Sequence, residues 1–134
     1  MAKLTDIEGI GPANAKKLKM AGVLTTHSLL KQGASPRGRE SIAEISGISL
    51  GMVLKWVNHA DLFRIHGVGE EYSDLLEQAG VDTVVELGKR RPDHLYKQMK
   101  LTNQEKRLVR KLPTETQVKD WIIQAKKLPR VISY

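Results

Sequence analysis

The chain has 134 residues, of which 40% are hydrophobic and 28% are charged, and its formal net charge is +7. This length allows one compact domain or two very small ones, which leaves little room for a deep cofactor cleft. The chain contains no cysteine, which excludes disulfides, thiolate zinc sites and thiol nucleophiles. Because only 4% of the residues are aromatic, packed helices are favoured over sheets, and we expect an all-α protein.

Glycine, proline and threonine positions divide the first half of the chain into short helices. We expect a short helix before Gly9 and a longer one from about Pro12 to the Ala-Gly-Val at 21–23, where glycine can end a helix in the left-handed conformation. The threonines just before the next apolar run favour a helix over 26–31. A loop is expected at 33–38, followed by two further helices.

The second half of the chain repeats the first. The matching pairs are 7–11 with 65–69, 21–23 with 79–81, 25–29 with 83–87, and 53–57 with 118–122. The first three pairs differ by 58 positions and the last by 65, which indicates one expanded loop with seven extra residues. We therefore expect helices from about Glu70 and over 83–89, with a loop near 91–93. The predicted organisation is two tandem repeats, 1–61 and 62–128, packed into one compact helical unit, and a tail at 129–134.

The first repeat opens with the motif Ile7-x-Gly-Ile-Gly-Pro-x-x-Ala-x-x-Leu18. Its two glycines allow a very tight turn between helices, and Pro12 pre-sets the backbone of the first helical residue. Ala15 leaves space for two helices to cross closely. The backbone N–H groups at the start of the second helix then point outward, where they and the helix dipole favour an anion. The predicted phosphate-binding residues are Gly9, Ile10, Gly11, Ala13, Lys16 and Lys17.

This motif resembles the helix-hairpin-helix motif of DNA-binding and repair proteins, which contacts the sugar-phosphate backbone without reading sequence. A weaker hairpin of the same kind occurs at 45–53, where Gly47 is kept and Ser49 replaces the second glycine. Paired hairpins resemble the double helix-hairpin-helix domains, in which two hairpins straddle the minor groove. The resemblance therefore adds Gly47 to the predicted nucleic-acid contacts.

The second repeat departs from the pattern. It keeps the glycines of its first hairpin, but Glu70, Glu71 and Asp74 follow them and would repel a phosphate, so we expect this hairpin to serve packing. The fourth hairpin, expected near 109–114, has no glycine. Basic residues recur there at helical spacing on one side, and we expect them to extend the nucleic-acid footprint. These residues are Lys106, Arg107, Arg110 and Lys111.

Over nearly its full length the chain is similar to an uncharacterised bacterial family of tandem helix-hairpin-helix proteins of unknown function. The resemblance implies the fold but no activity. The four histidines form no ligand pattern for a metal, and the two tryptophans, Trp56 and Trp121, fall on apolar helical faces as core residues. The Gly-Pro-Asp signature of helix-hairpin-helix glycosylases is absent, because Ala13 follows Gly11-Pro12. We expect no enzyme, no cofactor and no small-molecule substrate.

These observations favour a sequence-independent nucleic-acid binder, with DNA preferred over RNA as the partner. The alternative is a helical protein-interaction or scaffolding module, because half of the expected hairpins have lost their anion-binding character. The chain has no apolar signal core at its N-terminus and no stretch near the roughly 18 apolar residues of a membrane span. We therefore expect a cytoplasmic protein without a membrane partner.

Overall fold

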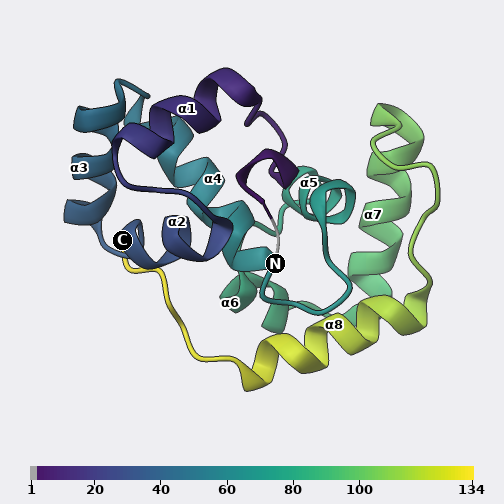
Figure 1. The fold of residues 1–134 in the computed structure, drawn as a ribbon. Coiled ribbons are helices and arrows are strands. Elements are labelled where there is room, and N and C mark those ends of the chain that lie inside the picture. Colours follow the sequence, from purple (N-terminus) through teal and green to yellow (C-terminus); the bar gives the residue numbers. More distant parts are fainter. Residues whose placement is uncertain (1–2) are drawn as a thin grey trace. The chain divides into compact units, whose positions relative to one another are not determined.

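The computed structural model describes residues 3–134 and is all-α, as predicted (Figure 1). Within these residues there is no strand, only an isolated antiparallel bridge between Lys3 and Thr25. None of the helices found there combines the length and the apolar character that crossing a membrane requires. The helices are the 3-10 helix η1 (Leu4–Asp6) and the α-helices α1 (Pro12–Met20), α2 (Thr26–Gln32), α3 (Pro36–Ser46), α4 (Leu50–Leu62), α5 (Glu70–Gln78), α6 (Val84–Gly88), α7 (Pro92–Lys106) and α8 (Glu115–Lys127).

The chain forms two compact units. The first consists of residues 1–61 together with 130–134, and the second of residues 62–129. In the first unit α1 packs against η1 and α3, and α2 packs against α3. Its core contains Leu18, Leu29 and, from α4, Val53 and Trp56. In the second unit α6 and α7 pack against α8, and α5 packs against α7.

The helices predicted to end at Ala-Gly-Val are confirmed as α1 and α5. After α1 the N–H of Gly22 donates to the carbonyl of Lys19 at 2.9 Å, and that of Val23 donates to Leu18 at 3.0 Å. These two bonds and the φ of +80° at Gly22 form a Schellman motif, which satisfies the last helical carbonyls. The counterparts after α5 are Gly80 to Glu77 at 3.0 Å and Val81 to Leu76 at 2.8 Å.

Threonine caps start the next helix in both units. The hydroxyl oxygen of Thr25 accepts a hydrogen bond from the N–H of Ser28 at 3.0 Å, and that of Thr83 accepts one from Glu86 at 3.2 Å. Each bond satisfies one of the free N–H groups at a helix start. Residues that lie 58 positions apart in the two repeats thus form equivalent backbone and side-chain hydrogen bonds.

The loops predicted at 33–38 and 91–93 are shorter than expected. Helices α3 and α7 already begin at Pro36 and Pro92. Proline is favourable as the first helical residue, because its fixed φ suits the helix and its missing N–H would have had no intrahelical partner. Proline was therefore a start signal at both positions and not, as predicted, part of a loop.

The extra residues of the second repeat are not confined to one expanded loop, so that prediction is wrong. Helix α7 has 15 residues whereas α3 has 11, and α6 has 5 whereas α2 has 7. The connection after α7 runs over 107–114, whereas the connection after α3 runs only over 47–49. The second repeat therefore differs from the first in both helix length and loop length.

Residues 130–134 are held on the first unit by the buried side chain of Arg39. Its Nη1 donates to the carbonyls of Gly33 at 2.9 Å and Ala34 at 3.2 Å, and its Nη2 donates to that of Ser133 at 2.7 Å. The N–H of Ser133 also donates to the carbonyl of Ala34 at 2.8 Å. A single guanidinium group thus joins the C-terminal residues to the start of α3.

Replacing Arg39 by methionine should lower the free energy of unfolding by about 2–3 kcal/mol, because the variant loses three hydrogen bonds from a charged group and removes the guanidinium donor from the buried carbonyl of Gly33. Urea denaturation followed by far-UV circular dichroism measures the change. Arg37→Met is the matched control, because Arg37 lies on the same helix but is exposed, and it should change stability by less than about 0.5 kcal/mol. Equal midpoints for the two variants would contradict this role of Arg39.

Candidate nucleic-acid interface

The first glycine turn, residues 9–11, links η1 to α1. Gly9 has a φ of +92°, a left-handed backbone that glycine adopts without the clash of a Cβ. Gly11 is the N-cap residue of α1, and Pro12 is its first residue. The side chain of Ile10 is buried, whereas both glycines are exposed. The turn is therefore anchored to the core by one apolar side chain and presents glycine backbone to solvent.

Helix α1 begins without a side-chain cap. Gly11 has no side chain that could bond the first N–H groups of the helix, and its carbonyl accepts from the N–H of Ala15 at 3.0 Å. The first N–H groups of any helix have no intrahelical partner. At α1 they belong to Ala13, which is exposed, and Asn14, which is half-buried, because Pro12 has no N–H. Together with the positive end of the helix dipole, these groups favour a bound anion.

An indole ring lies against the glycine of each turn. Trp56 of α4 is 1% exposed, and a Cβ on Gly9 would lie 3.3 Å from its Nε1 atom. In the second unit a Cβ on Gly67 would lie 3.0 Å from Nε1 of Trp121 on α8. A Cβ rarely approaches a neighbour this closely, so the indole contact adds to the positive φ in favouring glycine at both turns. The prediction that both tryptophans are core residues is confirmed.

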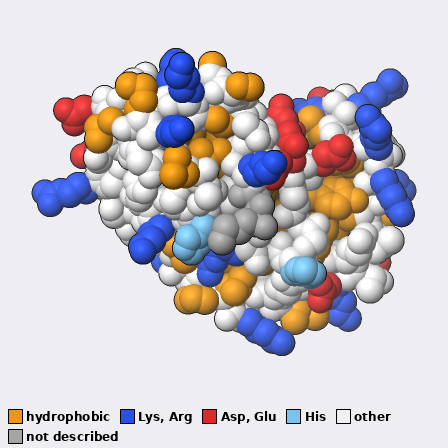
Figure 2. All heavy atoms as spheres, in the orientation of Figure 1, with side chains coloured by type: hydrophobic (Ala, Val, Ile, Leu, Met, Phe, Trp, Pro, Cys, Tyr) orange, Lys and Arg blue, Asp and Glu red, His pale blue; other side chains and the backbone are white. Residues whose placement is uncertain are grey.

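Two lysines follow the first glycine turn at the second turn of α1. Lys16 and Lys17 are exposed, and within residues 3–134 neither ammonium group forms an ion pair. Figure 2 shows basic side chains standing out from the surface over α1. Glu8, the neighbour of Gly9, is also exposed and opposes this positive charge. The charge beside the turn is therefore mixed, with an excess of cations.

The second glycine turn, residues 67–69, has the same geometry and the opposite charge. Gly67 has a φ of +99°, Val68 is buried, and Gly69 is the N-cap residue of α5 with no side-chain cap. The first turn of α5 carries Glu70 and Glu71. Carboxylates at this position stabilise the helix through its dipole but repel a phosphate. The second glycine turn therefore has the backbone geometry of the first but lacks the positive charge that would favour an anion.

The connection at 47–49 also lacks part of the anion-binding set. Gly47 ends α3 with a φ of +75°, and Ile48 is buried. The hydroxyl oxygen of Ser49 accepts a hydrogen bond from the N–H of Met52 at 3.3 Å, so one free N–H of α4 already has a partner. Figure 1 shows this connection and the start of α1 along the same upper edge of the first unit. The connection therefore offers fewer donors than the first glycine turn.

The predicted helical face of basic residues in the second unit is wrong. Helix α7 ends at Lys106, and Arg107 is its C-cap residue with φ 51° and ψ 51°. Its N–H donates to the carbonyl of Asn103 at 2.8 Å, just as the N–H of Gly47 donates to Ala43 at 2.9 Å. The helix ends here because the following apolar residues, Leu108, Val109 and Leu112, turn back to pack on the core.

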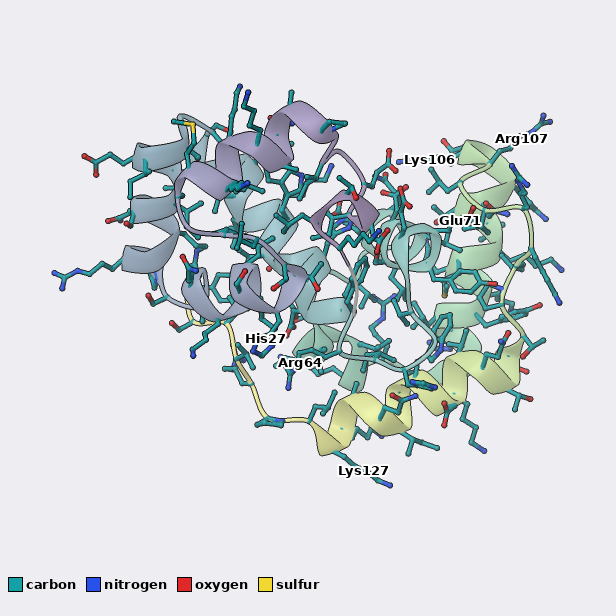
Figure 3. All side chains as sticks on the ribbon, in the orientation of Figure 1. His27, Arg64, Glu71, Lys106, Arg107 and Lys127 are labelled. Atoms are coloured by element: carbon teal, nitrogen blue, oxygen red, sulfur yellow. The ribbon has the colours of Figure 1, made fainter. Side chains whose placement is uncertain are left out.

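The basic residues lie instead on an ordered loop, residues 107–113, which we call the basic loop. The side chain of Asn103 accepts from the N–H of Val109 at 2.9 Å and donates to its carbonyl at 3.3 Å. The hydroxyl of Tyr72 donates to the carbonyl of Lys111 at 3.0 Å. Figure 3 shows Arg107 extending away from the ribbon. The exposed cations of the loop are Arg107, Arg110 and Lys111.

The predicted site residues thus fall into two groups, one in each unit. The group in the first unit consists of Gly9, Ile10, Gly11, Ala13, Lys16, Lys17 and Gly47, and the group in the second of Lys106, Arg107, Arg110 and Lys111. Lys106 differs from the other cations, because its Nζ donates to Oε1 of Gln78 at 2.5 Å. The sequence did not indicate the left-handed backbone of Arg107. Only the structural correspondence of α7 with α3, which ends at Gly47, shows it.

The fold and these turns define an all-helical protein of two units, each with a left-handed glycine turn packed on a tryptophan. The chain belongs to the family described as domain of unknown function DUF4332, whose profile matches residues 8–128. The matched span contains both glycine turns. No curated protein and no solved structure matches the chain.

Replacing Gly9 by alanine should destabilise the protein by about 1–3 kcal/mol, because an L-residue is strained at this φ and its Cβ would press on Trp56. Gly11→Ala should have a much smaller effect, since a Cβ there meets nothing within 4 Å and its φ is −86°. Thermal unfolding followed by circular dichroism compares the two variants. If both variants melt at the same temperature, the contact with Trp56 does not constrain the turn.

Proposed function

We propose that this protein binds nucleic acid, DNA in preference to RNA, by holding backbone phosphates at the first glycine turn in the manner of a helix-hairpin-helix motif. The observation that carries the proposal is the uncapped, exposed start of α1 behind a left-handed glycine, with Lys16 and Lys17 one turn further along the helix. Backbone N–H groups of Gly11 and Ala13 would bond the phosphate oxygens directly, whereas the N–H of Ile10 already donates to the carbonyl of Ile7 at 3.0 Å. The two lysines would neutralise the charge of neighbouring phosphates.

Binding of this kind positions a duplex without reading its bases, because phosphate contacts carry no direct sequence information. Gly47, at the end of α3, would supply a second and weaker contact. The second glycine turn is left out of the interface, because Glu70 and Glu71 begin its helix. The expected binding surface is therefore unequal between the two repeats and is strongest at the first turn.

The backbone of Arg107 supports a role for the basic loop in the same function. The equivalent position in the first unit is Gly47, which adopts the left-handed conformation without strain, whereas an arginine there costs about 1–2 kcal/mol. Non-glycine residues in this conformation are concentrated at functional sites. Arg107 and Arg110, both exposed on a loop that is anchored at Val109, would extend the phosphate contacts.

Exchanging Lys16 and Lys17 together for glutamate should weaken binding to a mixed-sequence DNA duplex by at least about tenfold at 50 mM salt. The log-log dependence of affinity on salt should become shallower by about 0.9 for each phosphate that the variant no longer neutralises. Fluorescence anisotropy over a salt titration measures both quantities. Lys31→Glu, an exposed exchange in the last turn of α2, should leave the slope unchanged. Absence of binding by the unaltered protein at 50 mM salt would refute the proposal.

Replacing Arg107 by glycine should raise stability and lower DNA affinity at the same time. Relief of the left-handed strain is expected to add about 1 kcal/mol to the free energy of unfolding, while removal of the guanidinium takes away one phosphate-binding group. Arg110→Gly removes the same charge without this relief, since Arg107 is the positive-φ residue among the non-glycines described. Urea denaturation and anisotropy test the pair. Unchanged DNA affinity in both variants would remove the basic loop from the interface.

A further inference from the structure

An open groove of about 540 Å³ lies along one flank of α1 in the first unit. Its apolar lining consists of Leu4, Pro12, Ala15, Val23 and Leu24, and its polar lining of Lys3, Thr5, Lys16 and Lys19. Pro12, Ala15, Lys16 and Lys19 recur at the spacing of one helical face. The groove is thus formed by the flank of α1, by Lys3 and the first residues of η1, and by the segment that follows α1.

The charge of the groove has one sign. Lys3, Lys16 and Lys19 are exposed, none of the lining residues is acidic, and within residues 3–134 none of the three ammonium groups forms an ion pair. Figure 2 shows basic side chains beside apolar ones over α1. Three unneutralised cations around an apolar surface complement a ligand that is itself both acidic and apolar.

The apolar part of the groove is a formed surface. Leu4 and Val23 are buried beneath it, whereas Leu24 at its rim is 61% exposed. The two segments that hold these residues are joined by the antiparallel bridge between Lys3 and Thr25. The apolar floor of the groove is therefore formed before a partner binds, and a partner could bury the exposed side chain of Leu24.

The residues that line the groove indicate which kind of acidic partner fits it. No lining residue is aromatic, so an unpaired nucleobase would find no ring on which to stack. The groove is also too open to bury most of a small molecule, as small-ligand sites do. A peptide helix fits better, because its carboxylates three or four residues apart lie about 5.4 Å from each other, and Lys16 and Lys19 are spaced by one turn in the same way.

We propose that this groove is a docking site for a short acidic amphipathic helix of a partner protein. Leucine-like side chains of the partner would cover Leu24 and the apolar floor, and its carboxylates would pair with Lys3, Lys16 and Lys19. Lys17 is not part of the lining, because it points about 100° away from Lys16 around the helix. Docking in the groove and phosphate binding at the first glycine turn therefore use α1 on different sides and share only Lys16.

The test uses the full chain and a labelled synthetic peptide of about 12 residues, with glutamate and leucine on opposite faces of its helix. Lys19→Glu should weaken peptide binding by about tenfold, and Leu24→Ser should weaken it severalfold. Lys17→Glu is the matched control, because it makes the same change of charge on the same helix outside the groove, and it should change the affinity less than twofold. Circular dichroism establishes that the variants remain folded.

Three results would overturn the proposal. They are no peptide binding by the unaltered chain, equal reductions in affinity for Lys19→Glu and Lys17→Glu, and displacement of the peptide by duplex or single-stranded DNA whose own binding depends on Lys19. The second result would indicate attraction by net charge alone, and the third would assign the groove to nucleic acid. Peptide binding without any DNA binding would instead refute the phosphate proposal and leave the docking site standing.

Discussion

Each unit of this protein depends on the contact between a glycine turn and the edge of an indole ring. At Gly9 and Gly67 the backbone is left-handed, and a Cβ would make an unusually close contact with Trp56 or Trp121. The contact brings the turn close to the last helix of its repeat. The next helix begins at an exposed glycine, without a side-chain cap on its first N–H groups. The feature that makes the first turn a candidate anion site is therefore a consequence of core packing.

Because packing forms the turn, charge can change without disruption of the scaffold. The second turn keeps a positive φ at its first glycine, a buried apolar residue between its glycines, and equivalent hydrogen bonds at the end of the following helix. Its following helix nevertheless begins with Glu70 and Glu71, which would repel an anion. The two repeats thus share a structural requirement and differ in surface chemistry. The ends of α3 and α7 likewise share a backbone conformation but differ in side chain, since Gly47 and Arg107 are both left-handed.

Helix α1 carries two kinds of surface at once. Its start presents backbone donors beside Lys17, while its flank presents an apolar groove edged by Lys16 and Lys19. Neighbouring lysines on a helix point in directions about 100° apart, so a short run of them can serve different ligands. Nucleic-acid binding and docking of a protein partner are thus compatible proposals for the first unit, since they use different sides of the same helix and share only Lys16.

The sequence by itself determined the features that depend on neighbouring residues. The glycine turns, the helix ends after α1 and α5, the threonine caps and the repeat offset follow from backbone preferences within a few positions, and the two tryptophans could be assigned to the core from their apolar faces. Tertiary structure decided the rest. The basic residues near Lys106 have helical spacing, but Leu108 and Val109 must turn back to the core, so the helix stops. The docking of Ser133 through Arg39 joins segments far apart in the chain, and the groove beside α1 depends on how η1, α1 and the segment after α1 pack together. Local preferences do not specify such contacts.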